Sequence, residues 1–462
     1  MADGGIAGFA PGYNPELGGG SSGAVATRAN QAGYVGPNTV SIILDGKTVL
    51  SGWIEVRLET YTEHCPNLFQ LTVTERLPDN AAEVILLPGM PCTVMVDNDP
   101  IVTGFIDRYE VLLDAHQHLV RITGRGKTED IVDSSALLHT RTLPAGVSGT
   151  TLPSGTVLQV AQALCDPYGI TVTGTDSGAM VPQINITLGQ TVYELIEMIA
   201  RWDGRLVYED SSGQLVLGVA GGAGTMSSGI QQAVNLQRAA VNLTMDERFH
   251  DYYAKAFNVA PVPMGTGAST ETATWTDTGA PGPPRLRQLV VIGENMNQGG
   301  APFNVTLAVW EGKRRAGRSF QIRALIDSWR DSAGRLWAPN AFISVDVPAA
   351  KISSQNWVIG QVIFIRDIAG GTTAELHCMP PDAFMPQPEL LSGIYPAIAA
   401  ASQPGGAGNV GATPSPSAAA PVSPGTPAAA GGSSAAGVQG LPGSPSGPPA
   451  SRTINSPGVQ QP

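Results

Sequence analysis

Residues 124–128 of the chain read Gly-Arg-Gly-Lys-Thr, a combination of residues that is found where proteins bind phosphate. A phosphate loop, however, is a longer glycine-rich turn that ends in Gly-Lys-Ser/Thr at the start of a helix. Here only Gly124 precedes the Gly126-Lys127-Thr128 step, and Arg121 stands where the first glycine of such a loop belongs. The segment therefore indicates a tight turn between a strand and an acidic helix start, and not a nucleotide site.

A possible metal site lies just upstream. Asp114, His116 and His118 occupy alternate positions, so on a strand their side chains would share one face. Imidazole and carboxylate groups at that spacing can bind a transition metal. Because the three residues fall in an Asp-Ala-His-Gln-His run between two expected strands, a solvated turn is the favoured interpretation. We expect neither a metal nor a cofactor.

Hydrolytic chemistry lacks the residues that it requires. Glycoside hydrolysis needs two carboxylates on either side of one cleft, whereas Glu209 and Asp210 are adjacent and would point to opposite faces of a strand. The sequence contains no His-Glu-x-x-His metallopeptidase motif. His64 and Cys65 are also sequence neighbours, and on a strand their side chains would diverge. The sequence predicts that the protein is not an enzyme.

Composition narrows the function further. The 462 residues carry a formal net charge of −12, and only 14% of them are charged. Neutralising phosphates takes lysine and arginine, so the acidic balance argues against a sequence-independent nucleic-acid binder. It does not argue against a channel through which DNA passes without being held.

The four cysteines show neither zinc-ligand nor redox spacing. We expect Cys65, Cys92, Cys165 and Cys378 to be small buried thiols in a reducing compartment. The N-terminus lacks the pattern of a secretory signal, and no apolar run approaches the length of a membrane span.

The chain divides into two arms and a β-rich centre. Residues 1–37 are rich in Gly and Ala, and residues 391–462 in Pro, Gly, Ala and Ser, so both are expected to be disordered. Short alternating runs separated by turn residues predict two small antiparallel β-barrel-like domains, residues 38–135 and 233–390. Residues 136–232 predict an α/β domain between them. The expected fold class is mainly β with an α+β insertion.

Local signals place several elements within this centre. Alternation on both sides of Asp45-Gly46 predicts a hairpin. Thr156 begins a predicted helix that reaches Cys165, and Thr191 begins a second one, with Glu194 three residues later as a capping box. A third helix, residues 304–316, is expected to interrupt the second β domain.

Two side-chain groups in the second β domain invite a functional interpretation. Five cations gather after this third helix, where they also suit the helix dipole. They are either a solvated helix end or a docking patch for an acidic partner or a neighbouring protomer, and a contact to DNA is the remaining reading; the five are Lys313, Arg314, Arg315, Arg318 and Arg323. Trp329 and Trp337 flank the turn 331–334 and predict a cross-strand aromatic pair that anchors the barrel.

Four segments together indicate a family. They are residues 121–135, 189–204, 328–340 and 371–384. In this order and at these spacings the chain resembles the phage Mu-type baseplate hub proteins of contractile tails, which are related to the hub region of type VI secretion spike proteins. The resemblance covers roughly residues 38–390. It implies a structural role, in holding turns and helix starts, for the matching positions Gly124, Arg125, Asp130, Asp133, Trp329 and Trp337.

The resemblance also implies a function. Such a hub is a homotrimeric ring in the virion that joins the six-fold tail tube to the trimeric central spike and forms part of the DNA ejection channel. Its expected partners are itself, the spike, the tail tube and tube-terminating proteins, and the baseplate wedge proteins, and DNA only in passage. It would be a late protein that assembles in the bacterial cytoplasm, and its long arms would order along neighbouring proteins.

Alternatives remain at this point. The hub of a phage-derived contractile injection particle or bacteriocin would share every residue-level feature. A cell-wall hydrolase would need the catalytic groups that are missing above. A carbohydrate-binding module would need exposed aromatic platforms, whereas the tryptophans here lie in strand patterns that suit burial.

Overall fold

A computed structural model describes residues 38–391, apart from residues 45, 47, 75–85, 115–117, 137–154, 183–185, 188, 258–269, 294–299 and 390. The disorder predicted for the two arms concerns residues outside this set, except for Leu391.

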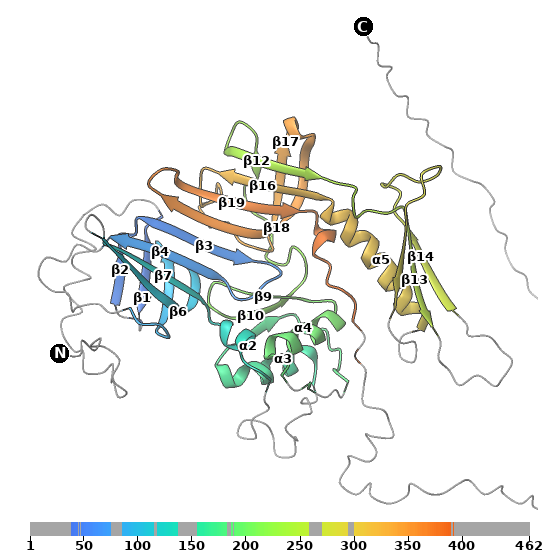
Figure 1. The fold of residues 1–462 in the computed structure, drawn as a ribbon, viewed down its shortest axis with the longest axis horizontal. Coiled ribbons are helices and arrows are strands. Elements are labelled where there is room, and N and C mark those ends of the chain that lie inside the picture. Colours follow the sequence, from blue (N-terminus) through green and yellow to red (C-terminus); the bar gives the residue numbers. More distant parts are fainter. Residues whose placement is uncertain are drawn as a thin grey trace, which may run out of the picture. The chain divides into compact units, whose positions relative to one another are not determined.

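A large sheet dominates the fold (Figure 1). Among the described residues it contains thirteen strands, and neighbouring strands run antiparallel except for β11 and β17. In spatial order the strands are β12 (Leu236–Leu243), β16 (Phe320–Ile326), β19 (Gly371–Met379), β18 (Ile352–Asp367), β3 (Glu55–Tyr61), β4 (Leu68–Thr74), β7 (His118–Gly126), β6 (Asp99–Leu113), β5 (Pro91–Val96), β1 (Val40–Leu44) and β2 (Thr48–Ser51), with β17 (Phe342–Val347) on β18 and β11 (Ile230–Gln231) on β17.

The sheet joins the two regions that the sequence assigns to separate barrel-like domains. β3 from the first region pairs with β18 from the second, with Tyr61 opposite Gln361 and Val56 opposite Arg366. One hydrophobic core cluster contains buried residues of both regions, including Leu58 and Phe364. The division into two barrel-like domains stays a prediction. The mainly β class is confirmed, and the described strands of both regions form one large sheet that was not predicted.

Alternation explains which strand face is buried. Along β3, Val56 and Leu58 turn into the core while Glu55 and Arg57 face solvent, as a period of two requires. The hairpin predicted around Asp45-Gly46 is confirmed, because β1 and β2 pair with Ile43 opposite Val49.

The α/β unit is built around a small mixed sheet. Its strands lie in the order β8 (Val172–Gly174), β10 (Leu215–Gly218) and β9 (Leu206–Glu209). The helices α2 (Glu129–Asp133), α3 (Val157–Cys165) and α4 (Val192–Trp202) gather beside it (Figure 1). The capping box predicted at Thr191 and Glu194 is present, and α3 begins with a second one, between Thr156 and Gln159, which was not predicted. The apolar side chains of α4, including Leu195 and Ile199, are buried.

A third unit departs from the sequence-based expectation. The strands β13 (Asp251–Phe257), β14 (Thr270–Thr276) and β15 (Gln288–Ile292) form a sheet of their own, and β14 was not predicted. The predicted helix is confirmed as α5 (Gly300–Arg318), which packs on one face of this sheet through Leu307 and Ala308. The strands β13, β14 and β15 thus do not join the sheet of the second β region. Alternation identifies a strand but not the sheet that it enters.

The chain leaves the large sheet through a short segment that touches two other units. After β19 comes a 3₁₀ turn, Pro381–Phe384, and the Met385 carbonyl then accepts a hydrogen bond from the Trp310 indole of α5 at 2.8 Å. Glu389 forms an ion pair with Arg201 of α4 at 3.2 Å, and Leu391 is buried in the α/β core. None of the described helices is long and apolar enough to cross a membrane.

Phe364 lies where the two β regions meet and gives a direct test of the shared core. Its side chain is fully buried and packs edge-on against Trp329 at 5.5 Å between ring centroids. Phe364→Ala should lower the free energy of unfolding by about 3–5 kcal/mol, measured by urea titration. Ile368→Ala, at a position that is 85% exposed, is the control and should change it by less than about 0.5 kcal/mol. Equal midpoints for the two variants would contradict the shared core.

Candidate functional site

Arg125 lies at the centre of a carboxylate cluster that fastens α2 to the large sheet. Its Nε is 2.6 Å from Asp107 of β6 and 3.1 Å from Glu129 of α2, and its Nη2 is 2.8 Å from Asp133. Hydrogen bonds to Asp133 and Asp107 raise the pKa of the guanidinium, and burial raises the pKa of Glu129. Asp130 contributes its backbone carbonyl, which accepts the Ser134 N–H at 3.1 Å.

The two glycines beside Arg125 are required by close packing. A Cβ at Gly124 would lie 2.2 Å from the Phe105 carbonyl oxygen and 2.3 Å from the Phe69 ring. A Cβ at Gly126 would lie 1.9 Å from Glu209 Oε2. The Lys127 ammonium donates to the Gly169 carbonyl. In the run that resembles a phosphate loop, the two glycines thus allow close packing, and Lys127 forms a hydrogen bond within the chain.

Glu209 is a buried carboxylate that joins three segments. It ends β9 with 1% of its surface exposed, and it accepts the backbone N–H groups of Asn67 at 2.7 Å and of Thr128 at 3.0 Å. Asn67 in turn donates from its side chain to the Glu209 carbonyl at 3.2 Å. Burial raises the pKa of Glu209 to about 7, although both N–H groups oppose that rise. The side chain therefore holds the α/β unit against the turns after β3 and β7.

The other groups considered for catalysis are used differently. The Asp210 carboxylate accepts the N–H groups of Ser212 at 2.8 Å and Gln214 at 2.9 Å, which shapes the β9–β10 turn. Burial raises the pKa of the Cys65 thiol well above its ordinary value, which works against a thiolate nucleophile. All four cysteines are free, and Cys92, Cys165 and Cys378 are buried.

Only two of the three candidate metal ligands lie in the part of the chain that the structure describes. Asp114 directly follows β6 and His118 begins β7, whereas His116 lies outside the described residues. No group of three or more His, Cys, Asp or Glu side chains within the described residues is arranged to hold a metal ion.

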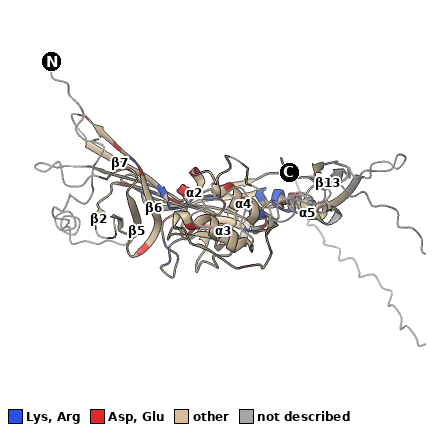
Figure 2. Ribbon diagram, turned by 90° about the horizontal axis from the view of Figure 1, so that it is seen from below, with Lys and Arg blue, Asp and Glu red and all other residues tan. Residues whose placement is uncertain are grey.

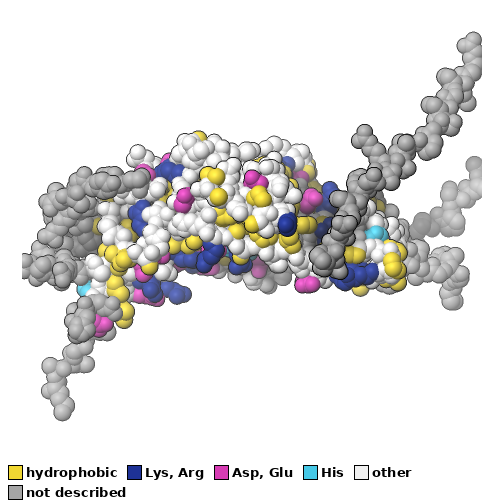
Figure 3. All heavy atoms as spheres, turned by 90° about the horizontal axis from the view of Figure 1, so that it is seen from above, with side chains coloured by type: hydrophobic (Ala, Val, Ile, Leu, Met, Phe, Trp, Pro, Cys, Tyr) yellow, Lys and Arg dark blue, Asp and Glu magenta, His cyan; other side chains and the backbone are white. Residues whose placement is uncertain are grey.

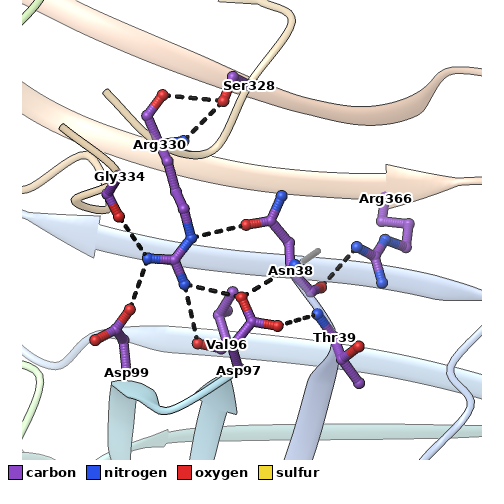
Figure 4. A network of polar contacts seen from close by, with 9 residues as sticks. All are labelled: Asn38, Thr39, Val96, Asp97, Asp99, Ser328, Arg330, Gly334 and Arg366. Carbon is purple, nitrogen blue, oxygen red and sulfur yellow. Dashed lines mark hydrogen bonds and ion pairs between the residues drawn. The ribbon is translucent and has the colours of Figure 1, made fainter. Parts of the chain in front are cut away.

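Arg330 forms a second joint, between the hairpin before β17 and the start of the first β region (Figure 4). Its guanidinium donates to Asp99 at 2.7 Å, to Asp97 at 3.0 Å and to the Asn38 side chain at 3.0 Å. Asp97 also accepts the N–H groups of Asn38 at 3.0 Å and Thr39 at 2.7 Å. Residues that are more than 200 positions apart in the sequence are thus fixed by one side chain.

The two tryptophans of the signature are buried beside this joint. Trp329 is 0% and Trp337 3% exposed, and the Trp337 N–H donates to the Trp329 carbonyl at 3.1 Å. Their indole N–H groups bond different carbonyls, those of Thr373 at 2.7 Å and Ser328 at 2.8 Å. The ring partner of Trp329 is Phe364, so the aromatic contact reaches across the sheet and not across the turn.

The basic cluster divides into paired and unpaired members (Figure 2 colours the cations of α5 blue). Arg314 and Arg318 both bond Glu63, at 3.0 and 2.8 Å, and Arg315 bonds Glu311 at 2.5 Å. The side chains of Lys313 and Arg323 have no hydrogen bond or ion pair with any described residue. The arginines of α5 line a hollow of about 510 Å³ together with Trp310 and Glu247. Partner binding by this cluster stays a prediction, now centred on its two unpaired members.

From the sequence, Glu209 could be weighed only as a catalytic carboxylate, and the roles of Asn67 and Asn38 were not predicted. No local signal marks them, because each acts on residues far away in the sequence. A buried acid that ends an apolar strand, as in Leu-Val-Tyr-Glu, is the one hint that was available.

Comparison with known proteins places the chain in a family context. Residues 39–126 match the family model of the Mu phage baseplate assembly protein GpP-like N-terminal domain. Residues 128–219 match that of the baseplate hub protein gp44-like second domain. The baseplate hub protein gp44 of Escherichia phage Mu is 26% identical over 357 residues, which cover 75% of this chain and 89% of that protein.

Two solved structures share the fold. The prophage MuSo2 43 kDa tail protein from Shewanella oneidensis superposes with a TM-score of 0.63 at 25% identity, over 75% of this chain and 99% of that one. The tail protein from Neisseria meningitidis MC58 superposes with a TM-score of 0.60 at 18% identity, over 77% of this chain and all of that one.

The buried Glu209 gives a pH-dependent prediction. Because its folded-state pKa is about 7 and its ordinary value is 4.5, the folded protein keeps a proton that the unfolded chain releases between these pH values. The stabilisation from this group is therefore complete below about pH 4.5 and is lost as the pH rises to about 7, by up to about 1.4 kcal/mol per pH unit. Glu209→Gln should remove this slope from the free energy of unfolding. The exposed Glu55→Gln should retain it, and parallel curves for Glu209→Gln and the wild type would contradict the assignment.

Arg330 gives a local prediction. Arg330→Ala leaves Asp97 and the Asn38 side chain without their cation, so the free energy of unfolding should fall by about 2 kcal/mol or more. Amide hydrogen exchange at Asn38 and Thr39 should accelerate at the same time. Arg238→Ala is the control, since Arg238 is exposed and makes no side-chain hydrogen bond or ion pair with the described residues. Unchanged exchange at Asn38 in Arg330→Ala would contradict the joint.

Proposed function

Because the chain is a Mu gp44-like baseplate hub protein, a component of the phage tail baseplate, we propose that three copies form a ring on the tail axis. The ring joins the six-fold tail tube to the trimeric central spike and surrounds part of the path that DNA takes on ejection. The observation that carries the proposal is the match to the hub protein gp44 of phage Mu, which runs over 89% of that protein.

The proposed role is mechanical, and the internal joints support it. A hub has to transmit force between the tube and the spike without its parts separating. The β3–β18 pairing, the Glu209 carboxylate and the Arg330 guanidinium each connect segments that are distant in the sequence. Closed cyclic symmetry then uses complementary surfaces on each copy, and no bond chemistry is needed.

The charge of the surface supports a role in which DNA passes the protein and is not held by it. Lys and Arg side chains are interspersed with Asp and Glu on the face drawn in Figure 3, and the whole chain has a net charge of −12. Tight retention of DNA takes a run of cations that neutralise several phosphates. A mixed and net acidic wall would let the polymer slide.

We assign the unpaired cations of the basic cluster to an acidic partner in the baseplate. Lys313 is partly exposed and Arg323 exposed, and their charges are not cancelled by any described residue. The spike, the tube-terminating proteins and the wedge proteins are the candidates for this contact.

The ring is tested by the native mass of the purified full-length chain. We expect a species of three times 47.8 kDa in analytical ultracentrifugation, and a ring with a central hole in electron micrographs. Co-expression with the spike protein is the control for the case in which the trimer forms only when the spike is present. A chain that stays at 47.8 kDa both alone and with the spike would contradict the proposal.

A further inference from the structure

The end of the β6–β7 hairpin exposes three apolar residues in a row. Val111, Leu112 and Leu113 are 48%, 57% and 71% exposed. They occupy both faces of the strand, because successive side chains alternate. We call these three residues the hairpin patch.

A second apolar surface belongs to the small sheet beside α5. Leu286, Val290 and Ile292 are 72%, 53% and 71% exposed, and we call them the sheet patch. α5 covers the opposite face, where Val291 packs against the cluster of Ala254 and Leu307. Six of the thirteen exposed large hydrophobic side chains among the described residues therefore fall in these two patches.

The sequence of β15 indicates that its open face is covered in the assembled protein. Residues 289–292 read Leu-Val-Val-Ile, so both faces of the strand are apolar, and β15 pairs with β13 in parallel. Strands of this composition in parallel pairs are normally buried on both sides. Among the described residues, only the face of β15 under α5 is covered, with Leu289 and Val291 partly buried. An apolar surface of this kind on a soluble protein marks an interaction site.

The charges around the two patches have opposite sign. Glu110, which lies 4.0 Å from Arg121, precedes the hairpin patch, and Asp114 follows it. Lys255 lies directly opposite Ile292 in the sheet register, and Arg285 and Arg287 adjoin Leu286. The one described carboxylate on this face of β13 is Asp251, which lies opposite Gln288 and contacts His250 and Thr276. Neither Lys255 nor Arg285 forms a side-chain hydrogen bond or ion pair with the described residues. The hairpin patch therefore has an acidic surround and the sheet patch a basic one.

We propose that the hairpin patch of one copy docks on the sheet patch of a second copy of this chain. The proposal rests on the proposed ring and names the surfaces that close it. A cyclic trimer needs a head-to-tail contact between two different surfaces of the same chain. Apolar cores with opposite charges at their rims are suited to such a contact, and every copy in the ring then has both patches covered. If two hairpin patches or two sheet patches met, charges of the same sign would face each other.

Three single substitutions test the contact. Leu113→Asp places a charge in the hairpin patch, and Ile292→Asp places one in the sheet patch, where it also faces the acidic hairpin. Each should weaken self-association of the full-length chain on the order of tenfold or more, as loss of a central interface side chain does. Ile368→Asp, at an 85% exposed apolar position outside both patches, is the matched control and should associate like the wild type. Sedimentation equilibrium measures all four chains, and their urea midpoints should agree because all three positions are exposed.

Mixing the two disrupted chains identifies the pairing. Leu113→Asp keeps an intact sheet patch and Ile292→Asp keeps an intact hairpin patch, so an equimolar mixture should form dimers that neither chain forms alone. These dimers cannot close a ring, because their remaining two patches are disrupted. If the patches instead paired like with like, one of the two chains would associate normally by itself.

The outcomes separate this inference from the ring itself. A trimeric wild type with Leu113→Asp and Ile292→Asp trimers as stable as those of Ile368→Asp would overturn the docking proposal and leave the ring standing, the patches then serving another baseplate protein. Disruption by both substitutions without mixed dimers would overturn the head-to-tail pairing. A wild type that is monomeric alone and with the spike would overturn both.

Discussion

The pairing of β3 with β18 is the constraint on which the rest of the structure depends. The two strands lie about 300 residues apart in the chain, and their antiparallel ladder turns the strands of two sequence regions into one sheet with one hydrophobic core. The chain between them contributes further strands to this sheet and leaves it twice, for the α/β unit and for the small sheet beside α5. Both excursions have to return to the sheet within the geometry that this pairing sets.

Polar side chains also connect the excursions to the sheet. Glu209 holds the α/β unit by accepting two backbone N–H groups. Arg125 connects α2 to the sheet, because its guanidinium pairs with Asp107 of β6 and with the carboxylates of α2. Arg330 performs the same task at the start of the first β region. Because these joints are buried or half-buried, forming each one costs desolvation free energy. Its hydrogen bonds and ion pairs offset that free energy only in one geometry. We infer that they specify a single rigid arrangement, as a force-transmitting hub requires.

The sequence predicted what is local and failed where the cause is distant. Thr156 and Thr191 begin their helices as predicted, and Leu58 turns inward as alternation requires. The separate sheet of β13–β15 was missed because a strand pattern does not specify its partner. The internal use of Arg314 and Arg318 was missed because their common partner, Glu63, lies about 250 residues away. The family resemblance, by contrast, depended on ordered motifs that survive in the sequence itself, and the match to a hub protein confirmed it.

The central claim is that this chain forms the axial ring between the tail tube and the spike. Electron cryomicroscopy of isolated tails tests it most directly, because the number and place of its copies can be read from the map. The account predicts three copies around the axis at the tube–spike junction, with the large sheet of each copy unbroken from β12 to β2. Density for this chain elsewhere in the baseplate, or in a copy number other than three at that junction, would contradict it.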